Sequence, residues 1–430
     1  MSAPGYAPRA AAAHLLNGVL TEHRLLTDMV NSKDGPLAKL PPQGKARAQS
    51  LATDTLRNLG RIDIVIDQFL QKEPPITVRN ALRLATCELI VDKIPPHAAV
   101  DAVVRLVKNN RQTTRMAGMA NAVARRISEN GAEIWADLEP TPLPPYLAKP
   151  IRQTYGKDVL AAIEQAHENG APIDITLQSP ADTDDLVEAL EASVLSTGSL
   201  RLFKWGQIST MPGFEEGAWW VQDASAAIPA QLLGDVAGKK VLDICAAPGG
   251  KTMQLAAAGG DVTAIDLSKY RMERVRENLT RTKLSAELVV VDVLKYQPDQ
   301  KFDSILLDAP CSATGTIRRH PDLPYVKADL GLQPVLELQK QMLNRAAGWL
   351  ETGGKLVFCT CSLLPAEGED QIAAFLESHP DFEQVAIAPE THGLQPDWVN
   401  KTGAMRLRPD FWADRGGMDG FYAAILTKRA

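Results

Sequence analysis

Short apolar runs alternate with helical patterns along the second half of the chain. The runs predict strands, and stretches with an apolar residue every three or four positions predict the helices between them. The expected strands are 240–244, 262–265, 287–291, 302–307, 355–359, 382–387 and 421–427, and the expected helices lie near 224–233, 251–258, 269–282, 335–350 and 368–379. This alternation predicts a doubly wound α/β sheet of seven strands. The last strand follows a glycine-rich turn without a helix before it, so we expect it to enter antiparallel.

The first part of the chain, from residue 10 to about 127, has a helical pattern throughout. Leucine, valine and isoleucine recur at helical spacing, and the runs are separated by prolines at positions 36, 41, 42, 74, 75, 95 and 96. Prolines in such places are typical of connections between helices. The pattern therefore predicts an all-α domain.

The middle of the chain differs from both of these parts. Residues 139–146 are rich in proline and indicate a linker, and the segment up to 222 mixes helical patterns with strand-like runs at 173–177 and 201–204. This order suits a small α+β subdomain. We therefore expect a multidomain protein with a helical domain at 1–138, a linker and small subdomain at 139–222, and an α/β domain at 223–430.

Composition and charge narrow the class of protein. The 430 residues are 45% hydrophobic, but no run approaches 18 uncharged apolar residues, and residues 1–9 lack the basic-then-apolar order of a signal peptide. We therefore expect a cytoplasmic protein with no membrane partner, and a monomer. The net charge of −6 argues against polyanion binding over the whole surface, so any contact with nucleic acid must be a local patch.

A glycine-rich loop follows the first expected strand of the α/β domain. Pro248, Gly249 and Gly250 end the strand and precede a helix, a place where α/β sheets bind nucleotide-like ligands. The loop has neither the P-loop spacing nor G-x-G-x-x-G, so both phosphate-binding interpretations are weak. A ligand with a carboxylate and a nucleoside, such as S-adenosylmethionine, fits better. A plain strand–helix turn remains the alternative.

Acidic residues follow the next three expected strands. Asp266 could accept hydrogen bonds from both ribose hydroxyls, with a helix cap as the alternative, although Ser268 is better placed to cap. Asp292 would lie beside the adenine amino group, and Asp308 begins a further polar loop. Because parallel strands end at one edge of a sheet, we expect these three acids to share one crevice.

Four of the five cysteines lie at or just beyond strand ends. A four-cysteine metal site is one explanation, but the only close pair is Cys359 and Cys361, which lacks the usual C-x₂₋₄-C spacing. If Cys245 and Cys359 are buried hydrophobes, Cys311 and Cys361 remain for chemistry. A thiolate adding to C6 of cytosine would make C5 nucleophilic enough to accept a methyl group, and an acid beside N3, the role we give Asp308, would stabilise the adduct. The residues alone leave the two thiols nearly tied as the nucleophile.

Three motifs carry a resemblance to a known family. Cys245-Ala-Ala-Pro-Gly-Gly-Lys251, Asp308-Ala-Pro-Cys-Ser-Ala-Thr-Gly315 and Thr360-Cys-Ser362 resemble the signature motifs of the RNA 5-methylcytosine methyltransferases. Residues 308–322 and the helical domain resemble more narrowly the bacterial branch that modifies 16S ribosomal RNA, whose N-terminal domain is similar to NusB, an RNA-binding helical bundle. The resemblance implies a Rossmann-like class I methyltransferase domain.

The resemblance also implies roles for individual residues. It makes Cys361 the nucleophile and Cys311 the group that assists proton removal or product release. It places S-adenosylmethionine against a set of residues along the strand ends. These cofactor-binding residues are Cys245, Ala246, Ala247, Pro248, Gly249, Gly250, Lys251, Asp266, Asp292 and Asp308.

Two groups of basic residues are candidates for RNA contact. Arg318, Arg319 and His320 follow the fourth strand and could hold phosphate near a flipped base, with loop salt bridges as the alternative. Arg105, Lys108 and Arg111 belong to a basic stretch at the end of the helical domain, where a solvated helix face is the alternative.

Two departures from the family pattern limit what the resemblance implies. Thr86 stands where a glycine is expected, which could loosen helix packing, and Ile175-Thr-Leu-Gln178 lacks an expected arginine. The catalytic motifs act only on base and cofactor, so they do not separate ribosomal RNA from tRNA. A non-catalytic RNA-binding ribosome assembly factor is the alternative from another class of function.

Overall fold

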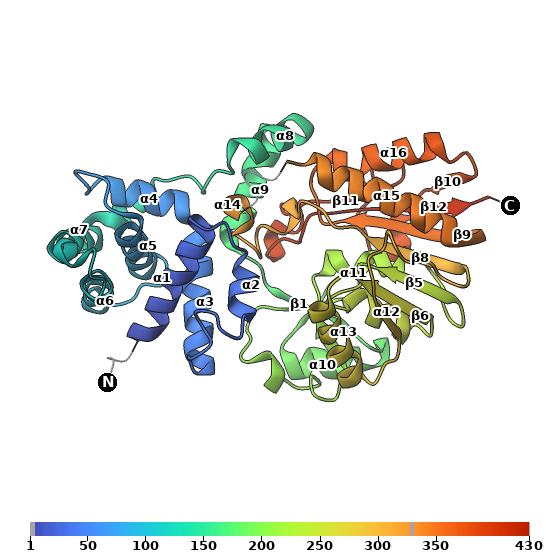
Figure 1. The fold of residues 1–430 in the computed structure, drawn as a ribbon, viewed down its shortest axis with the longest axis horizontal. Helices are drawn as coiled ribbons and strands as arrows, with labels where there is room; N and C mark the ends of the chain where they lie inside the picture. Colours follow the sequence, from blue (N-terminus) through green and yellow to red (C-terminus); the bar gives the residue numbers. More distant parts are fainter. Residues whose placement is uncertain (1–4, 327–330, 430) are drawn as a thin grey trace. The chain divides into compact units, whose positions relative to one another are not determined.

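The computed structural model describes residues 5–326 and 331–429, which form two compact units (Figure 1). The first unit joins the chain up to residue 170 with a second segment that begins at residue 317; the second unit contains the remainder. The stretch 139–222, expected as one linker and subdomain, is divided between the two units at residue 170.

The described part of the first unit is helical, as its apolar pattern predicted. Its helices are α1 (Tyr6–Leu20), α2 (Leu26–Asn31), α3 (Pro42–Arg57), α4 (Leu59–Asp67), α5 (Ile76–Ile90), α6 (Pro96–Lys108), α7 (Ala117–Ala136), α8 (Pro145–Tyr155), α9 (Lys157–Asn169) and the short α14 (Leu323–Val326). Prolines occupy the first position of α3, α6 and α8, where the missing N–H costs nothing and the fixed φ suits a helix.

Helix α5 lies at the centre of the first unit and is buried along most of its length. Its Glu88 is 1% exposed and pairs with Arg9 of α1 at 2.8 Å and with Arg47 of α3 at 2.6 Å. A buried carboxylate is costly unless it is paired, so this ionic contact specifies how three helices meet. Thr86 is also buried, and its hydroxyl donates to the Leu82 carbonyl of the same helix at 2.9 Å, which satisfies the polar group left inside the core.

Helix α14 belongs to the first unit although it comes from the sequence of the α/β domain. Its neighbour Asp322 is 2% exposed and accepts a hydrogen bond from the Leu26 N–H at 2.9 Å. Tyr146 donates to the Pro324 carbonyl at 2.8 Å. Figure 1 shows α14, in orange, beside the blue and green helices of this unit. The segment from residue 317 is therefore a structural part of the helical unit.

The second unit begins with a small antiparallel sheet. Its described strands, in the order β2-β3-β1-β4, are β1 (Ile173–Leu177), β2 (Ser193–Val194), β3 (Leu200–Leu202) and β4 (Trp219–Val221), with α10 (Thr183–Leu190) between β1 and β2. Asp174 and Arg201 form a fully buried ion pair at 2.7 Å between β1 and β3. The strand expected at 173–177 is confirmed as β1, and the strand expected at 201–204 is β3, which begins one residue earlier and ends at Leu202; β2 and β4 were not predicted.

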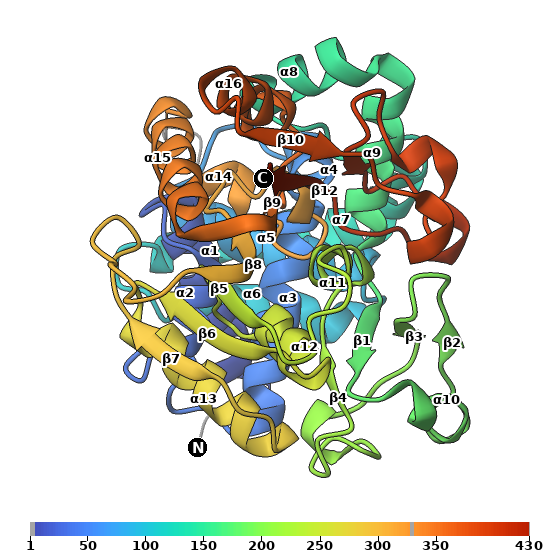
Figure 2. The same cartoon turned by 90° about the vertical axis from the view of Figure 1, so that its right-hand side faces the viewer.

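The large sheet confirms the expected α/β fold. In the described residues its strands run β10-β12-β9-β8-β5-β6-β7, and a further short strand, β11, pairs with β12. The strands are β5 (Lys240–Ile244), β6 (Asp261–Asp266), β7 (Glu287–Val290), β8 (Phe302–Asp308), β9 (Leu350–Thr360), β10 (Phe382–Val385), β11 (Met405–Leu407) and β12 (Phe421–Lys428). Figure 2 shows the twisted sheet from its edge strand β7 to β10. As predicted, β12 enters antiparallel to β9.

Helices cover both faces of this sheet because its strands carry apolar residues on both sides. They are α11 (Ala224–Gln231), α12 (Gly250–Ala257), α13 (Lys269–Thr282), α15 (Gln333–Trp349) and α16 (Glu369–Ser378). Successive side chains of a strand point to opposite faces. Val241 accordingly packs in one core with residues of α11 and α12, whereas Leu242 packs in the other with α15 and α16. Near-continuous apolar runs are therefore what a doubly covered sheet requires.

Strands β5, β6, β7, β8 and β9 are parallel, so their C-terminal ends meet at one edge. The loops that carry the predicted chemistry all leave the sheet at this edge. Among the described residues, no helix is both long and apolar enough to cross a membrane.

Candidate active site

The loop between β5 and α12 holds the predicted cofactor motif, Cys245 to Lys251. Gly249 has φ 103°, a left-handed conformation, and a Cβ built there would lie 3.0 Å from Cγ1 of Val275. Cys245 adopts φ 63°, which non-glycine residues rarely do. Backbone held in a sparsely populated conformation needs support from its surroundings and is frequent at functional sites.

The three predicted acids lie at the C-terminal edge of the sheet. Asp266 is the last residue of β6, Asp308 is the last residue of β8, and Asp292 follows β7. Asp308 is 31% exposed, and one of its oxygens lies 2.8 Å from Nζ of Lys251 in the cofactor loop. The structure therefore brings the glycine loop and the acid of the Asp308 motif into direct contact.

Asp266 is fully buried, and its oxygens already have partners. They accept from the N–H groups of Ala247 at 3.3 Å and Ser268 at 2.8 Å, and Arg271 pairs with the same carboxylate at 2.9 Å. The helix cap is Ser268, whose hydroxyl accepts from the Arg271 N–H. In this conformation, a contact between Asp266 and a ribose would replace the Arg271 contact, because Arg271 is the exposed partner.

Burial and charge also perturb two neighbouring groups. Burial raises the pKa of Asp243 to about 7, although the Thr252 hydroxyl donates to it at 2.6 Å. Burial, the largest single effect, lowers the pKa of Lys251, but Asp308, Cys359 and Asp243 together raise it above its usual value. Lys251 is therefore a permanent cation beside Asp308.

The two thiols selected for chemistry lie side by side, with Sγ of Cys311 and Sγ of Cys361 3.4 Å apart. Cys359 is fully buried, and its thiol donates to Asp308 at 3.5 Å. In the described part of the chain, no group of three or more His, Cys, Asp or Glu side chains is arranged to hold a metal ion. Cys311 and Cys361 thus form a pair of thiols, and Cys359 contacts the acid Asp308.

The surroundings of Cys361 make its thiol a weak acid. Its hydrogen bond with Cys311, followed by burial, raises the pKa of Cys361 well above the ordinary value, and only Lys251 opposes this effect. A thiol must lose its proton before it can act as a nucleophile. The arrangement therefore holds Cys361 protonated at neutral pH until a bound group or base removes the proton.

The predicted RNA contact of Arg318 needs correction. Its side chain is fully buried, and Arg318 belongs to the helical unit, where its carbonyl accepts from Arg57 at 3.1 Å. The two arginines and burial together lower the pKa of His167 to about 3, with burial the larger cause. Arg319 is half-buried and His320 is exposed. A fully buried guanidinium is not exposed to RNA phosphate, so this structure does not support the predicted contact of Arg318.

The other predicted basic residues remain at the surface of the first unit. Arg105 and Lys108 lie in the last turn of α6, and Arg111 follows in the next turn; all three are exposed. Arg105 pairs with Asp101 at 2.8 Å, an exposed i,i+4 contact worth only a few tenths of a kcal/mol. Such a weak pair leaves the arginine available to an anionic partner.

Glu367 lies beside the thiol-bearing loops, and no motif in the sequence selects it as a site residue. It is fully buried and hydrogen-bonds to Ser312 and Ser362, the residues that follow the two cysteines. The only local signal is an acidic residue six positions after Cys361. Local pattern cannot reveal that this residue points inward.

The fold and this edge together define the class of protein. A sheet of parallel strands with one antiparallel strand, β12, between β9 and β10, a glycine loop after β5 and acids at the ends of further strands is the architecture of class I methyltransferases. The chain has this fold in its second unit.

Comparison with known proteins identifies the family. Residues 230–427 match the family described as 16S rRNA methyltransferase RsmB/F, and residues 7–129 match the NusB family. The ribosomal RNA small subunit methyltransferase B of Pseudomonas putida is 35% identical over 98% of this chain and 99% of its own length; that of Escherichia coli O9:H4 is 31% identical over 98% of both. A solved structure of a methyltransferase homologue from Pyrococcus horikoshii, 26% identical, covers 66% of this chain and 95% of that one with a TM-score of 0.55. The chain belongs to the RsmB/F family of methyltransferases.

Proposed function

We propose that this protein transfers a methyl group from S-adenosylmethionine to carbon-5 of a cytosine in RNA, with 16S ribosomal RNA as the substrate. The observation that carries the proposal is the pair of thiols, Cys311 and Cys361, 3.4 Å apart in the loops after β8 and β9, with the charge of Asp308 acting on Cys361. Methylation at this carbon needs one thiol to activate the ring and a second group to complete the reaction. The names of the relatives support ribosomal RNA as the substrate.

The residues at the strand ends suit S-adenosylmethionine. Gly249 and Gly250 let a ligand approach the backbone. Asp292 can accept from the adenine amino group, and the partly exposed Asp308 lies where it can border the positive sulfonium. We assign the Cys245–Lys251 loop, Asp266, Asp292 and Asp308 to this ligand. When bound, it supplies an electrophilic methyl group.

The chain's own residues would act on the cytosine in a defined order. Cys361 gives its proton to solvent and its sulfur forms a bond to C6; the C5–C6 π pair shifts to C4–C5, and the C4–N3 pair shifts to N3, which takes up a proton beside Asp308. C5 is then the nucleophile and accepts the methyl group, and N3 gives its proton back as the C4–N3 double bond re-forms. A base next removes the C5 proton, the C5–C6 double bond re-forms, and the sulfur–C6 bond breaks so that Cys361 leaves as a thiolate. We assign Cys311 to this last stage because of its contact with Cys361.

The remaining parts of the chain are assigned to RNA binding. Arg105, Lys108 and Arg111 form an exposed basic surface of the NusB-like unit and would contact phosphates, and Arg319 and His320 would contact phosphate near the target base. We place the protein in the cytoplasm as a monomer.

The test is tritium transfer from labelled S-adenosylmethionine to in-vitro-transcribed 16S RNA, with wild type and Cys361→Ala compared. We expect label at C5 of cytosine with wild type and none with Cys361→Ala. Label on bulk tRNA alone would support the proposed reaction but show that tRNA, and not 16S ribosomal RNA, is the substrate. Tight RNA binding without label on any RNA would contradict the proposal and favour an assembly factor.

A further inference from the structure

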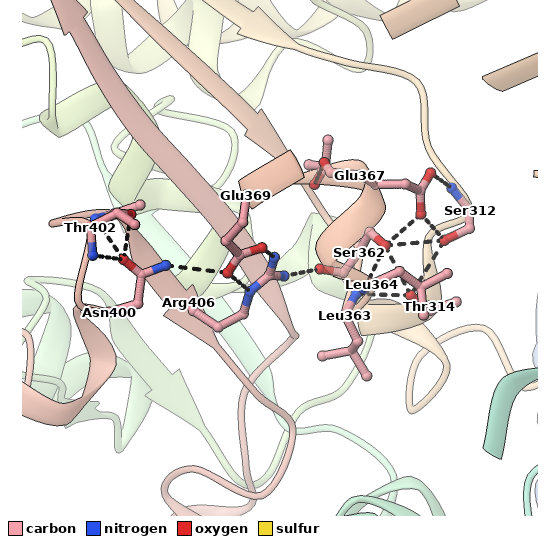
Figure 3. Close-up of polar contacts among 12 residues, drawn as sticks. Ser312, Thr314, Ser362, Leu363, Leu364, Glu367, Glu369, Asn400, Thr402 and Arg406 are labelled. Carbon is pink, nitrogen blue, oxygen red and sulfur yellow. Dashed lines mark hydrogen bonds and ion pairs between the residues drawn. The ribbon is translucent and has the colours of Figure 1, made fainter. Parts of the chain in front are cut away.

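Glu367 bridges the two loops that carry the thiols. One of its oxygens accepts from the Ser312 N–H at 2.7 Å and from Nε2 of Gln339 at 3.1 Å; the other accepts from the Ser362 hydroxyl at 2.5 Å and from the Ser312 hydroxyl. Figure 3 shows both serines directed at this carboxylate. Ser312 follows Cys311 and Ser362 follows Cys361. Glu367 therefore holds the residue directly after each of the two cysteines.

The same two loops are joined on either side of this bridge. The Gly315 N–H donates to the Cys361 carbonyl at 3.0 Å, and the Leu363 N–H donates to the Thr314 hydroxyl at 2.9 Å. Neither bond holds a cysteine side chain. They do, however, hold the two loops together. A change at Glu367 is therefore expected to shift the cysteines while the loops stay joined.

A second contact fixes Ser362 from its other end. Arg406, on the short strand β11, donates to the Ser362 carbonyl and pairs with Glu369, while its guanidinium lies 4.7 Å from the ring centre of Tyr422. Asn400 donates to Glu369 at 3.2 Å, as Figure 3 also shows. The residue after Cys361 is therefore held through both its side chain and its backbone.

The chemistry of a carboxylate explains why this position suits glutamate. An ionised carboxylate is only an acceptor and can take several donors on its two oxygens. Hydrogen bonds to a charged acceptor are stronger than those between neutral groups, and burial makes an incomplete set costly. Four donors from three residues supply such a set around Glu367.

We propose that Glu367 is a positioning residue that sets the separation of the Cys311 and Cys361 thiols for cytosine methylation. The inference rests on the proposed function. Addition of sulfur to C6 and the later release of the product both depend on where the two sulfurs lie. The hydrogen-bond partners of the Glu367 carboxylate are Ser312, Gln339 and Ser362, which lie outside the cofactor loop after β5. Loss of Glu367 therefore acts on turnover and not on cofactor affinity.

The experiment compares Glu367→Ala and Glu367→Gln with wild type. Removal of the bridge should lower kcat by roughly 10²-fold, the cost of a small misplacement of reacting groups. The KM for RNA and the Kd for S-adenosylhomocysteine should stay within about two-fold, as expected when only the reacting geometry changes. Glutamine should restore most of kcat because its amide oxygen accepts from Ser312 N–H and Gln339, while its NH₂ can donate to the serine hydroxyls.

Asp303→Ala is the matched control, because Asp303 is a carboxylate at the opposite end of β8 that accepts from the Lys240 N–H. It should retain wild-type kcat. If Glu367→Ala does not fold, Ser312→Ala and Ser362→Ala each remove one arm of the bridge and should lower kcat with KM unchanged.

Two results would overturn the inference while the proposed function stands. One is wild-type kcat in Glu367→Ala or, if that variant does not fold, in both serine variants. The other is a loss of cofactor affinity equal to the loss of kcat, which would indicate a general structural role. Absence of methyl transfer by wild type would instead contradict the proposed function itself.

Discussion

At the scale of single residues, the contact between the two thiols raises the pKa of Cys361. The hydrogen bond with Cys311 and burial both raise the pKa of Cys361, so the reactive thiolate is scarce at neutral pH and its fraction grows as pH rises. Formation of a sulfur–carbon bond should accordingly accelerate with increasing pH.

Cys311→Ala should lower the pKa of Cys361, because it removes the hydrogen bond that is the largest cause of the increase. Alkylation of Cys361 by iodoacetamide can be followed by peptide mass spectrometry over a pH series. The rate increases with pH in both proteins, and we expect this increase to begin at a lower pH in the variant than in wild type. Cys87, buried in the helical unit, is the internal control and should stay unlabelled in both. An unchanged curve, or a shift to higher pH, would contradict this assignment.

At the scale of elements, the turn between β5 and α12 depends on a left-handed glycine. Gly249→Ala places a Cβ at φ 103° and 3.0 Å from Cγ1 of Val275. The backbone cost is about 1–2 kcal/mol, and the contact with α13 must also relax. We expect reduced stability together with weaker binding of S-adenosylhomocysteine.

Gly353→Ala separates these two effects. Gly353 also has a left-handed φ, 78°, but a Cβ there meets nothing within 4 Å, and it lies near the start of β9, away from the strand ends that carry the site. Gly353→Ala should lower stability, measured by thermal unfolding, by an amount similar to Gly249→Ala. The Kd for the cofactor, measured by calorimetry, should stay unchanged. Equal loss of affinity in the two variants would show that the glycine loop has no special relation to the cofactor.

Elements were predictable from the sequence where the local pattern is long. The strand at 240–244 was found with its observed bounds because an apolar run is the requirement of a strand buried on both faces. β11 was missed because three residues carry no period, yet it supplies Arg406 to Ser362. The edge with three acids followed from the rule that parallel strands end together.

At the scale of the whole molecule, contacts distant in sequence determine the division into two units, and these were not predictable. Asp322 and Leu26 are hydrogen-bonded although 296 positions apart, and Arg318 is buried in the helical unit. From sequence, residues 317–326 could only be assigned to the α/β domain that precedes and follows them. For the same reason the inward orientation of Glu367 could not be foreseen.

Asp322→Ala tests whether this segment is structural in the helical unit. The change leaves the Leu26 N–H without its acceptor in a buried place, which costs on the order of 1–3 kcal/mol. Hydrogen exchange should increase around residue 26 and in 317–326, while the amides of β5 and β8 keep their protection. Unaltered exchange at residue 26 would contradict the structural role of this carboxylate.

The central claim concerns a covalent bond from Cys361 to cytosine, and trapping with 5-fluorocytosine-substituted 16S RNA measures it most directly. Fluorine at C5 cannot leave as a proton does, so the reaction should stop with the RNA attached to the enzyme. With S-adenosylmethionine present, we predict a stable adduct whose mass maps to the peptide of Cys361 and is absent in Cys361→Ala. An adduct that maps to Cys311, or methylation of normal RNA without any trapped complex, would contradict the account.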